Sequence, residues 1–380
     1  MNISPYSLHF YNNKSEKLQQ NIWNELKKGI WKNFKIDNFL LNSKISAEQP
    51  HKMQNIFEEF KVVYPGTSFN TKTKHLEQDL FSPNFIKTDK NELYKIFENY
   101  FNQFSNKKTA VHLSGGLDSS IIIGLLHHFK IPFYLVGLVS HRFEFRTEKA
   151  IQEKLSSLGK ETVLIDMDDY PSFSNLKNKP LSQLPDSNIK QVEAGKAIVR
   201  QCKRLNVDVV FTGQGGDTIF VDDMSTNKEW KCNIGNEFIM DFESQVLYPD
   251  EGIELVSPFA DKNIIQALYS LRKGEKGDHL KKWARQFFKD VLPRELVEYT
   301  YCADFFGTSM SGLDSAKPEI RDLFNTAYDI TQNKIFSQKK VNRFLAMDVF
   351  DFEYQDYIDY CNKISLATWY NGLLREGYVK

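Results

Sequence analysis

A run of glycine, serine and aspartate residues, Ser114-Gly115-Gly116-Leu117-Asp118-Ser119-Ser120, has the residue types needed to hold a phosphate group. Adjacent glycines let the backbone approach an anion closely, and the serines add hydroxyl donors. An aspartate in such a loop would repel phosphate unless a divalent cation lay between them. The run therefore predicts a pyrophosphate site that also binds Mg²⁺ through Asp118.

A second glycine-rich run, Thr212-Gly213-Gln214-Gly215-Gly216-Asp217, repeats this design with closely spaced glycines and one carboxylate. Neither run has the GxxxxGK[ST] or GxGxxG spacing, which disfavours a P-loop NTPase and a dinucleotide-binding enzyme. An ordinary capped turn would explain one run alone. Two such runs, each at the end of a predicted strand, can flank one triphosphate.

The elements that position these runs alternate between strand and helix. The continuous apolar run at 207–211 is typical of a central parallel strand. This alternation predicts right-handed crossovers and a doubly wound parallel α/β sheet of about five strands, with ligands at the carboxyl ends of the strands. The predicted strands are 109–113, 132–139, 162–165 and 207–211, and the predicted helices between them are 121–129, 147–158 and 190–205.

The segments on either side of this core have different patterns. From residue 261 to 380 the pattern is mainly helical, which predicts a helical subdomain packed on the sheet. Before the core, apolar residues every four positions predict an amphipathic helix over 15–33, and the segment 60–76 predicts two extended pieces around a turn. We therefore expect a small α+β extension at 1–88, and one domain at 89–380 with its sheet core at about 107–260.

The composition excludes several other kinds of protein. The 380 residues carry 49 Lys and Arg against 49 Asp and Glu, so no overall positive charge exists to bind a nucleic acid or an anionic membrane. The four cysteines form no CxxC pair, which argues against a zinc ribbon and a disulfide framework. Without a signal peptide or a long apolar run, the sequence predicts a folded cytoplasmic protein, and it does not indicate an oligomeric state.

The two glycine-rich runs together resemble those of a known family. SGGLDSS followed by GQGGD is similar to the synthetase domain of the asparagine synthetases, beta-lactam synthetases and lasso-peptide cyclases, which are PP-loop ATP pyrophosphatases. The segment Val256–Asp261 resembles the V-P-F-x-D segment of the family, and His279–Trp283, followed by Phe287–Leu296, resembles its K-x-x-L-R…LP segment. The resemblance runs from about Val62 to about Phe306.

The resemblance implies an adenine nucleotide alpha hydrolase-like fold, ATP as cosubstrate, and Mg²⁺ ligated by Asp118 and Asp217. In the family, ATP activates a carboxylate as an acyl-adenylate, a nitrogen nucleophile attacks it, and AMP and pyrophosphate leave. The residues that it places around ATP are Leu113, Ser114, Gly115, Gly116, Leu117, Asp118, Ser119, Ser120, Leu135, Val136, Gly137, Gly213, Gln214, Gly215, Gly216 and Asp217.

Three features depart from the family. Relatives that use glutamine carry a cysteine directly after the first methionine, whereas this chain has Asn2, and residues 1–88 are too few for a glutaminase domain. We therefore expect only a remnant of an amidotransferase-type domain there. Gln214 and Thr218 replace acidic residues of the second motif and lower its negative charge. The stretch 298–307, where the family has a lysine at the reacting centre, contains no Lys or Arg.

Other residues could supply the missing groups. Lys281, Lys282 or Arg285 could provide the cation, although lysines on helices are more often solvated. Glu193, on the helical pattern before the second run, could act as a base near the substrate, or could lie on a solvated helix face.

The leading hypothesis is an ATP-dependent, AMP-forming ligase that makes an amide or another C–N bond, on a peptide or a natural-product intermediate. Its nitrogen would come from the substrate, from free ammonia or from a partner protein. One alternative is an ATP pyrophosphatase that modifies a nucleobase or tRNA, although the balanced charge weighs against it. The other is a regulator that binds ATP but has lost catalysis.

Overall fold

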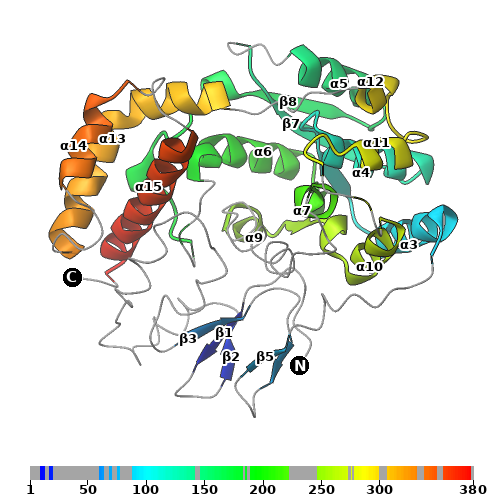
Figure 1. Cartoon of the computed structure of the whole chain (residues 1–380), viewed down its shortest axis with the longest axis horizontal. Coiled ribbons are helices and arrows are strands. Elements are labelled where there is room, and N and C mark those ends of the chain that lie inside the picture. The colour runs from blue at the N-terminus through cyan, green and yellow to red at the C-terminus, as the bar shows by residue number, and fades with distance from the viewer. Residues whose placement is uncertain are drawn as a thin grey trace.

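The computed structural model describes most of the chain after residue 87 and five short strands before it (Figure 1). The described ranges are 88–141, 146–182, 189–221, 246–272, 278–298, 306–331, 338–348 and 354–377, the single residues 185 and 275, and the strands named below for the first 87 residues. None of the helices described in these ranges is long and apolar enough to cross a membrane.

A five-stranded sheet forms the centre of the described structure, in the order β10-β9-β6-β7-β8, and all four strand pairs are parallel. The alternation of strands and helices in the sequence correctly predicted this doubly wound α/β fold. Its strands are β6 (Thr109–His112), β7 (Tyr134–Val139), β8 (Thr162–Asp166), β9 (Val209–Phe211) and β10 (Glu254–Val256).

The chain fills this sheet in two directions from β6. It passes from β6 to β7 and β8 on one side, then crosses back to place β9 and β10 on the other side. The reversal lies between β6 and β9, and ligands of open parallel sheets bind at such a point, outside the carboxyl ends of the strands. The two glycine-rich runs follow β6 and β9 directly, so the topology brings them to this position.

Helices cover both faces of the sheet because successive strand residues point to opposite sides. Val111 and Leu113 face one fully buried cluster, and Ala110 faces the other. The first cluster is built with α3 (Lys90–Asn102), α4 (Leu117–His128), α5 (Arg146–Ser156), α10 (Lys262–Leu271), α11 (Lys282–Phe287) and α12 (Arg294–Glu298). The second is built with α6 (Val192–Arg204), α9 (Tyr248–Asp250), α13 (Phe306–Thr331), α14 (Gln338–Ala346) and α15 (Tyr354–Arg375).

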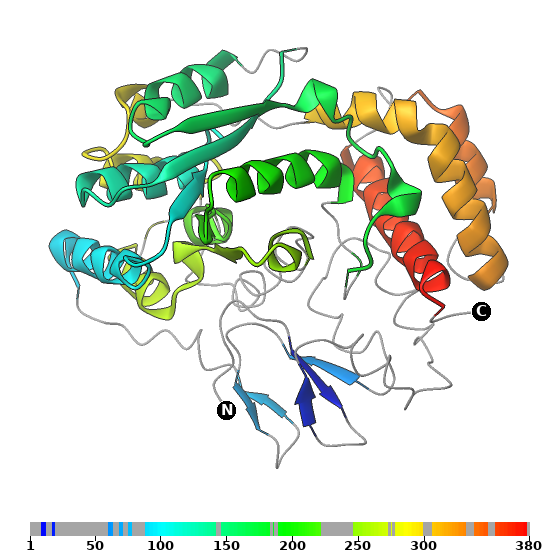
Figure 2. The ribbon, with the colours of Figure 1, turned by 180° about the vertical axis from the view of Figure 1, so that it is seen from behind.

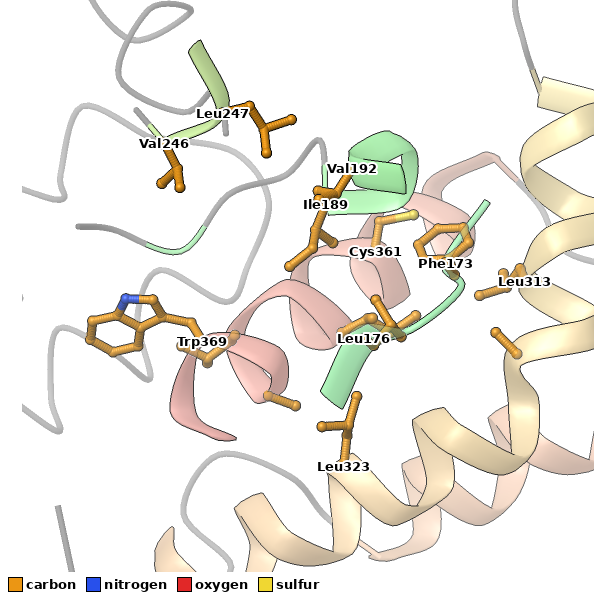
Figure 3. Packing of buried hydrophobic residues seen from close by; sticks show 14 of the residues in the cluster. Phe173, Leu176, Ile189, Val192, Val246, Leu247, Leu313, Leu323, Cys361 and Trp369 are labelled. Carbon is orange, nitrogen blue, oxygen red and sulfur yellow. The ribbon is translucent and has the colours of Figure 1, made fainter. Parts of the chain in front are cut away.

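The described part of the chain after residue 260 is helical apart from its connections, as the sequence predicted. Helices α13, α14 and α15 gather at the end of the molecule away from α3 and α10 in both views (Figures 1 and 2). The segment between β8 and α6 packs against them, and Figure 3 shows its Phe173 and Leu176 beside Leu313 of α13 and Cys361 of α15. This contact attaches the C-terminal helices to the sheet through the same face as α6.

The first 87 residues contain two small antiparallel sheets in their described part. The strands of one are β1 (His9–Asn12), β2 (Lys17–Gln19) and β3 (Phe60–Val63), and those of the other are β4 (Ser68–Asn70) and β5 (His75–Glu77). The first of the two extended pieces predicted over 60–76 is β3, and the second is divided into the two antiparallel strands β4 and β5.

The helix predicted over 15–33 is wrong at its start. Residues Lys17–Gln19 form a strand paired with β1, in which Leu18 lies opposite Tyr11. Pairing with a neighbouring strand satisfies the backbone there, and such tertiary contacts override a local helical pattern. The rest of the predicted helix lies outside the described residues.

Candidate nucleotide and metal site

The first glycine loop, residues 114–120, joins the end of β6 to the start of α4. Gly115 has a φ of 80°, a left-handed conformation that glycine adopts without strain. A side chain at Gly115 would also meet the backbone of Glu148 in α5, at 2.7 Å from its carbonyl oxygen. The first N–H groups of α4 have no acceptor within the helix and face the loop, as in phosphate-binding helix termini.

The serine hydroxyls of this loop have different roles. Ser120 is fully buried, and its Oγ donates to the carbonyl of Gly116 at 2.6 Å, so this hydroxyl holds the loop in shape and does not reach a ligand. Ser119 Oγ lies 2.7 Å from Ser114 Oγ and 3.2 Å from the Gly116 carbonyl oxygen. Ser114 is exposed, which leaves its hydroxyl as the most accessible of the three predicted donors.

The second glycine loop, residues 212–217, joins β9 to the short helix α7 (Gly216–Phe220). Gly215 has a φ of 84°, again in the left-handed region. The V-P-F-x-D-like segment supports this loop: Ser257 Oγ donates to the Gln214 carbonyl at 2.6 Å, and the Thr212 N–H donates to the Val256 carbonyl at 2.9 Å. Asp261 of that segment caps α10 by accepting from its first N–H groups.

The two loops are packed against each other. A Cβ on Gly213 would lie 2.8 Å from the backbone nitrogen of Ser119, and a Cβ on Gly216 would lie 2.4 Å from Cγ of Asp118. Glycine is therefore required at both positions for the loops to approach this closely. The contact brings Asp118, from the first loop, next to Asp217, from the second.

Lys281 connects the two aspartates. Its Nζ lies 2.6 Å from Oδ2 of Asp118 and 2.6 Å from Oδ1 of Asp217. The side chain of Lys281 is only 9 % exposed, whereas that of Asp217 is 75 % exposed. Burial acts to lower the pKa of Lys281, but the two carboxylates outweigh it and raise this pKa, so the ammonium stays charged. Lys281 thus supplies a buried positive charge at the site.

The backbone around Lys281 holds its side chain toward the loops. Lys281 has a φ of 52° and precedes the first turn of α11. Its N–H donates to the Asp278 carbonyl at 2.8 Å, and Asp278 Oδ1 accepts from the Leu280 N–H at 3.0 Å. The buried Arg285 donates through Nε to the Leu280 carbonyl at 2.7 Å and also to the Leu296 carbonyl. Arg285 therefore supports the backbone before α11 with its guanidinium, and does not serve as the free cation that the sequence suggested.

The carboxylates fit a magnesium ion bound together with phosphate. Oδ1 of Asp118 is buried and has no hydrogen-bond partner among the residues that the structure describes, although buried carboxylate oxygens are normally satisfied. Burial is the main cause that raises the pKa of Asp118, and Lys281 opposes it. Mg²⁺ is commonly held by one or two carboxylates together with substrate phosphates, which matches Asp118 and Asp217. In the described ranges no cluster of three or more His, Cys, Asp or Glu could hold a metal ion alone.

The other predicted nucleotide contacts lie on β7. The side chains of Leu135 and Val136 are fully buried on opposite faces of the sheet, so only their backbone can approach a nucleotide. A Cβ on Gly137 would lie 2.3 Å from the Leu113 carbonyl oxygen, which keeps β7 close to the start of the first loop.

Two of the predicted catalytic side chains lie elsewhere. The side chain of Lys282 is 72 % exposed, and its Nζ lies 3.9 Å from Asp278. Glu193 accepts from the ammonium groups of Lys179 and Lys196, each at 2.9 Å. Burial would raise the pKa of Glu193, but these two hydrogen bonds outweigh it and lower the pKa, which is the wrong direction for a base at neutral pH. Most of the stretch 298–307, where the family has a lysine and this chain has none, lies outside the described ranges, which omit residues 299–305.

The segment that carries both loops is similar to a known protein family. Residues 103–231 match the asparagine synthase family. This match confirms the resemblance for that part of the chain, and with it an ATP-using synthetase domain. The span ends before Lys281, so the lysine bridge is a feature of the structure that the match does not cover.

A solved structure is also similar to part of this chain. The NMN synthetase from Francisella tularensis is similar over 58 % of this chain and 100 % of its own, at 12 % sequence identity and a TM-score of 0.28. A similarity of this size does not bear on the activity. No curated protein matches the chain.

The pattern of the sequence did not reveal Gln152, which holds the carboxyl ends of two strands together. This side chain is buried, and its Nε2 donates to the carbonyls of Leu113 at 3.0 Å and Leu138 at 2.8 Å. A glutamine on a helix gives no sequence signal for such a contact. It positions the first glycine loop by holding the end of β6 against β7.

His112, the last residue of β6, was also not predicted. Its Nε2 lies 2.6 Å from Oη of the buried Tyr248, and burial lowers the pKa of His112 to about 4. In the unfolded chain this pKa returns to about 6.5, so the unfolded state binds more protons between these values. Acidification through this window therefore destabilises the native protein.

We expect the free energy of unfolding to fall by as much as about 3 kcal/mol through His112 between pH 6.5 and pH 4. Urea unfolding at a series of pH values would measure this, with His112→Gln as the comparison. The variant should lose this part of the pH dependence and still reach Tyr248 with its amide. Equal slopes for both proteins across the window would contradict the prediction.

Proposed function

We propose that the protein is an ATP-dependent, AMP-forming ligase that adenylates a carboxylate and transfers the acyl group to nitrogen. The observation that carries this proposal is the Lys281 bridge, which joins the aspartates of two glycine loops at the switch point of the sheet. The loops have N–H groups and metal-type carboxylates for a polyphosphate, and the buried ammonium adds a positive charge where the leaving pyrophosphate becomes more negative. The match to the asparagine synthase family supports an ATP-using synthetase domain at these loops.

In the proposed reaction a carboxylate oxygen attacks the α-phosphorus of ATP, the bond to the β-phosphate breaks, and pyrophosphate leaves. A nitrogen nucleophile then attacks the acyl-adenylate, loses a proton and displaces AMP. The loop N–H groups and Ser114 would hold the phosphates in line, and Lys281 would stabilise the pyrophosphate. Magnesium held by Asp118 and Asp217 would neutralise charge on the same oxygens.

For the substrates we propose a peptide or a natural-product carboxylate. The nitrogen would be an amine of that substrate, free ammonia, or nitrogen delivered by a partner protein. In support, residues 1–201 contain no cysteine, so that part of the chain offers no thiol nucleophile for glutamine hydrolysis.

The experiment is to incubate the purified protein with ATP, Mg²⁺ and pools of amino acids, peptides and other carboxylates, and to measure pyrophosphate and AMP. A pool that contains the substrate should release both in equal amounts. Release of ADP and orthophosphate would contradict the proposal. ATP binding without AMP formation with any pool would favour the regulator, and AMP formation that requires tRNA would favour nucleic-acid modification.

A further inference from the structure

We infer that Lys281 is an internal counter-ion that occupies the metal-binding carboxylates until the nucleotide arrives, and that a divalent cation must displace it toward the phosphates. This inference rests on the proposed function, because it assumes that Asp118 and Asp217 receive Mg²⁺ with ATP. It adds that metal without nucleotide is held off by the protein itself.

The geometry places the ammonium where a shared metal would have to bind. Nζ lies 2.6 Å from Oδ2 of Asp118 and from Oδ1 of Asp217, so the ammonium already occupies one oxygen of each carboxylate that a metal ion would share. A dication and an ammonium cannot both lie between the same two oxygens without strong repulsion. A dication on the remaining oxygens would lie beside the ammonium, and this repulsion favours departure of Nζ from at least one carboxylate when metal binds both.

The charges of the site favour the same exchange. Two carboxylates with one lysine leave a net charge of −1, which attracts a dication less than the −2 of the bare aspartates would. With Mg²⁺ added the sum becomes +1, which suits a pyrophosphate group. The lysine thus disfavours metal alone and favours metal together with a polyanion.

Lys281 can also reach a new partner. An ammonium has three N–H donors, and the two aspartates use two of them. Within the described ranges its third donor has no protein acceptor. The turn at Asp278 and the bracing by Arg285 fix the backbone, so the exchange needs only a change of side-chain rotamer.

The test compares wild type with Lys281→Met in two binding measurements. Binding of Mn²⁺ alone, followed by electron paramagnetic resonance, should tighten about tenfold in the variant because the competing cation is gone. Binding of ATP with saturating Mg²⁺, followed by calorimetry, should weaken about tenfold because a charge-assisted contact to phosphate is lost. A purely structural lysine would weaken both, so the opposite signs are the decisive result.

Two further variants serve as controls for these binding measurements. Lys281→Arg keeps the charge and should leave binding of Mn²⁺ alone weak, and Lys282→Met removes an exposed charge and should change neither measurement. If Lys281→Met binds Mn²⁺ no more tightly than wild type does, the inference is overturned while the proposed function stands. If wild type binds no ATP with Mg²⁺, the proposed function fails first.

A measurement on the unaltered chain keeps the inference testable should Lys281→Met fail to fold. The rate at which an amine-reactive acylating reagent modifies Lys281 can be read by peptide mass spectrometry. It should be low without ligand, rise severalfold with Mn²⁺ alone, and fall again with ATP and Mg²⁺. A rate that Mn²⁺ does not raise would overturn the inference.

Discussion

Replacing Asp118 by asparagine should lower the affinity of the protein for ATP in the presence of Mg²⁺ by at least about a hundredfold, since loss of even an outer partner of a metal commonly costs ten- to a hundredfold. Asp118 has a buried oxygen without a partner in the described part of the chain, and it shares Lys281 with Asp217. An amide cannot supply the same charge to a metal ion.

Calorimetric titration with ATP at saturating Mg²⁺ measures this effect, and thermal unfolding shows whether the variant is folded. Asp290→Asn is the matched control, because Asp290 is an exposed carboxylate that pairs with Lys90 on the surface. The control should bind ATP as wild type does. An Asp118→Asn variant that is folded and keeps wild-type affinity would show that the metal is held elsewhere.

The second large effect is expected for Gly216→Ala. The added Cβ would lie 2.4 Å from Cγ and 2.6 Å from Oδ2 of Asp118, which can rotate away, and 2.8 Å from Cβ of Asp118, which the backbone holds in place. Gly216 lies in the first turn of a helix, where alanine is otherwise favourable. We therefore expect Asp118 to turn away from Lys281 and the affinity for ATP with Mg²⁺ to fall at least about thirtyfold, with a loss of stability of about 1 kcal/mol from the Cβ contact that remains.

Gly213→Ala provides the contrast for this prediction. Its Cβ would lie 2.8 Å from the backbone nitrogen of Ser119 and 3.0 Å from the backbone carbonyl carbon of Asp118, which cannot rotate away. All three atoms closest to this Cβ are fixed by the backbone, so this variant should lose more stability than Gly216→Ala, up to about 3 kcal/mol, as well as affinity. Equal melting temperatures for the two variants would contradict the distinction between a conflict with one fixed atom at Gly216 and a conflict with three at Gly213.

The sequence predicted the fold well where the pattern is local. Glycine-rich runs after apolar strands indicated the loops, and four of the five core strands were predicted close to their observed bounds. The fifth, β10, has only three residues, and the helix directly before it, α9, also has only three, so neither gives a clear sequence pattern. Such a short strand becomes recognisable only when it pairs with β9.

The site was harder to predict because tertiary contacts decide which of two adjacent residues lies in it. Lys281 and Lys282 are adjacent and chemically alike, yet one is 9 % and the other 72 % exposed. The difference comes from the left-handed backbone at Lys281, set by hydrogen bonds to Asp278 and by Arg285 bracing the neighbouring Leu280. Gln152 and Glu193 follow the same rule, since the carbonyls that Gln152 binds and one of the two lysines on Glu193, Lys179, come from other segments of the chain.

The bridge at Lys281 joins groups that are 163 residues apart in the chain. A site closed by contacts of such long range cannot form in a partly folded molecule, because the loops and the lysine meet only when the sheet and α11 are assembled. Nucleotide and metal should therefore bind the native state alone and raise its apparent stability by about 2.7 kcal/mol at a hundred times the dissociation constant. In a cell, the supply of ATP would then influence how long this protein resists proteolysis.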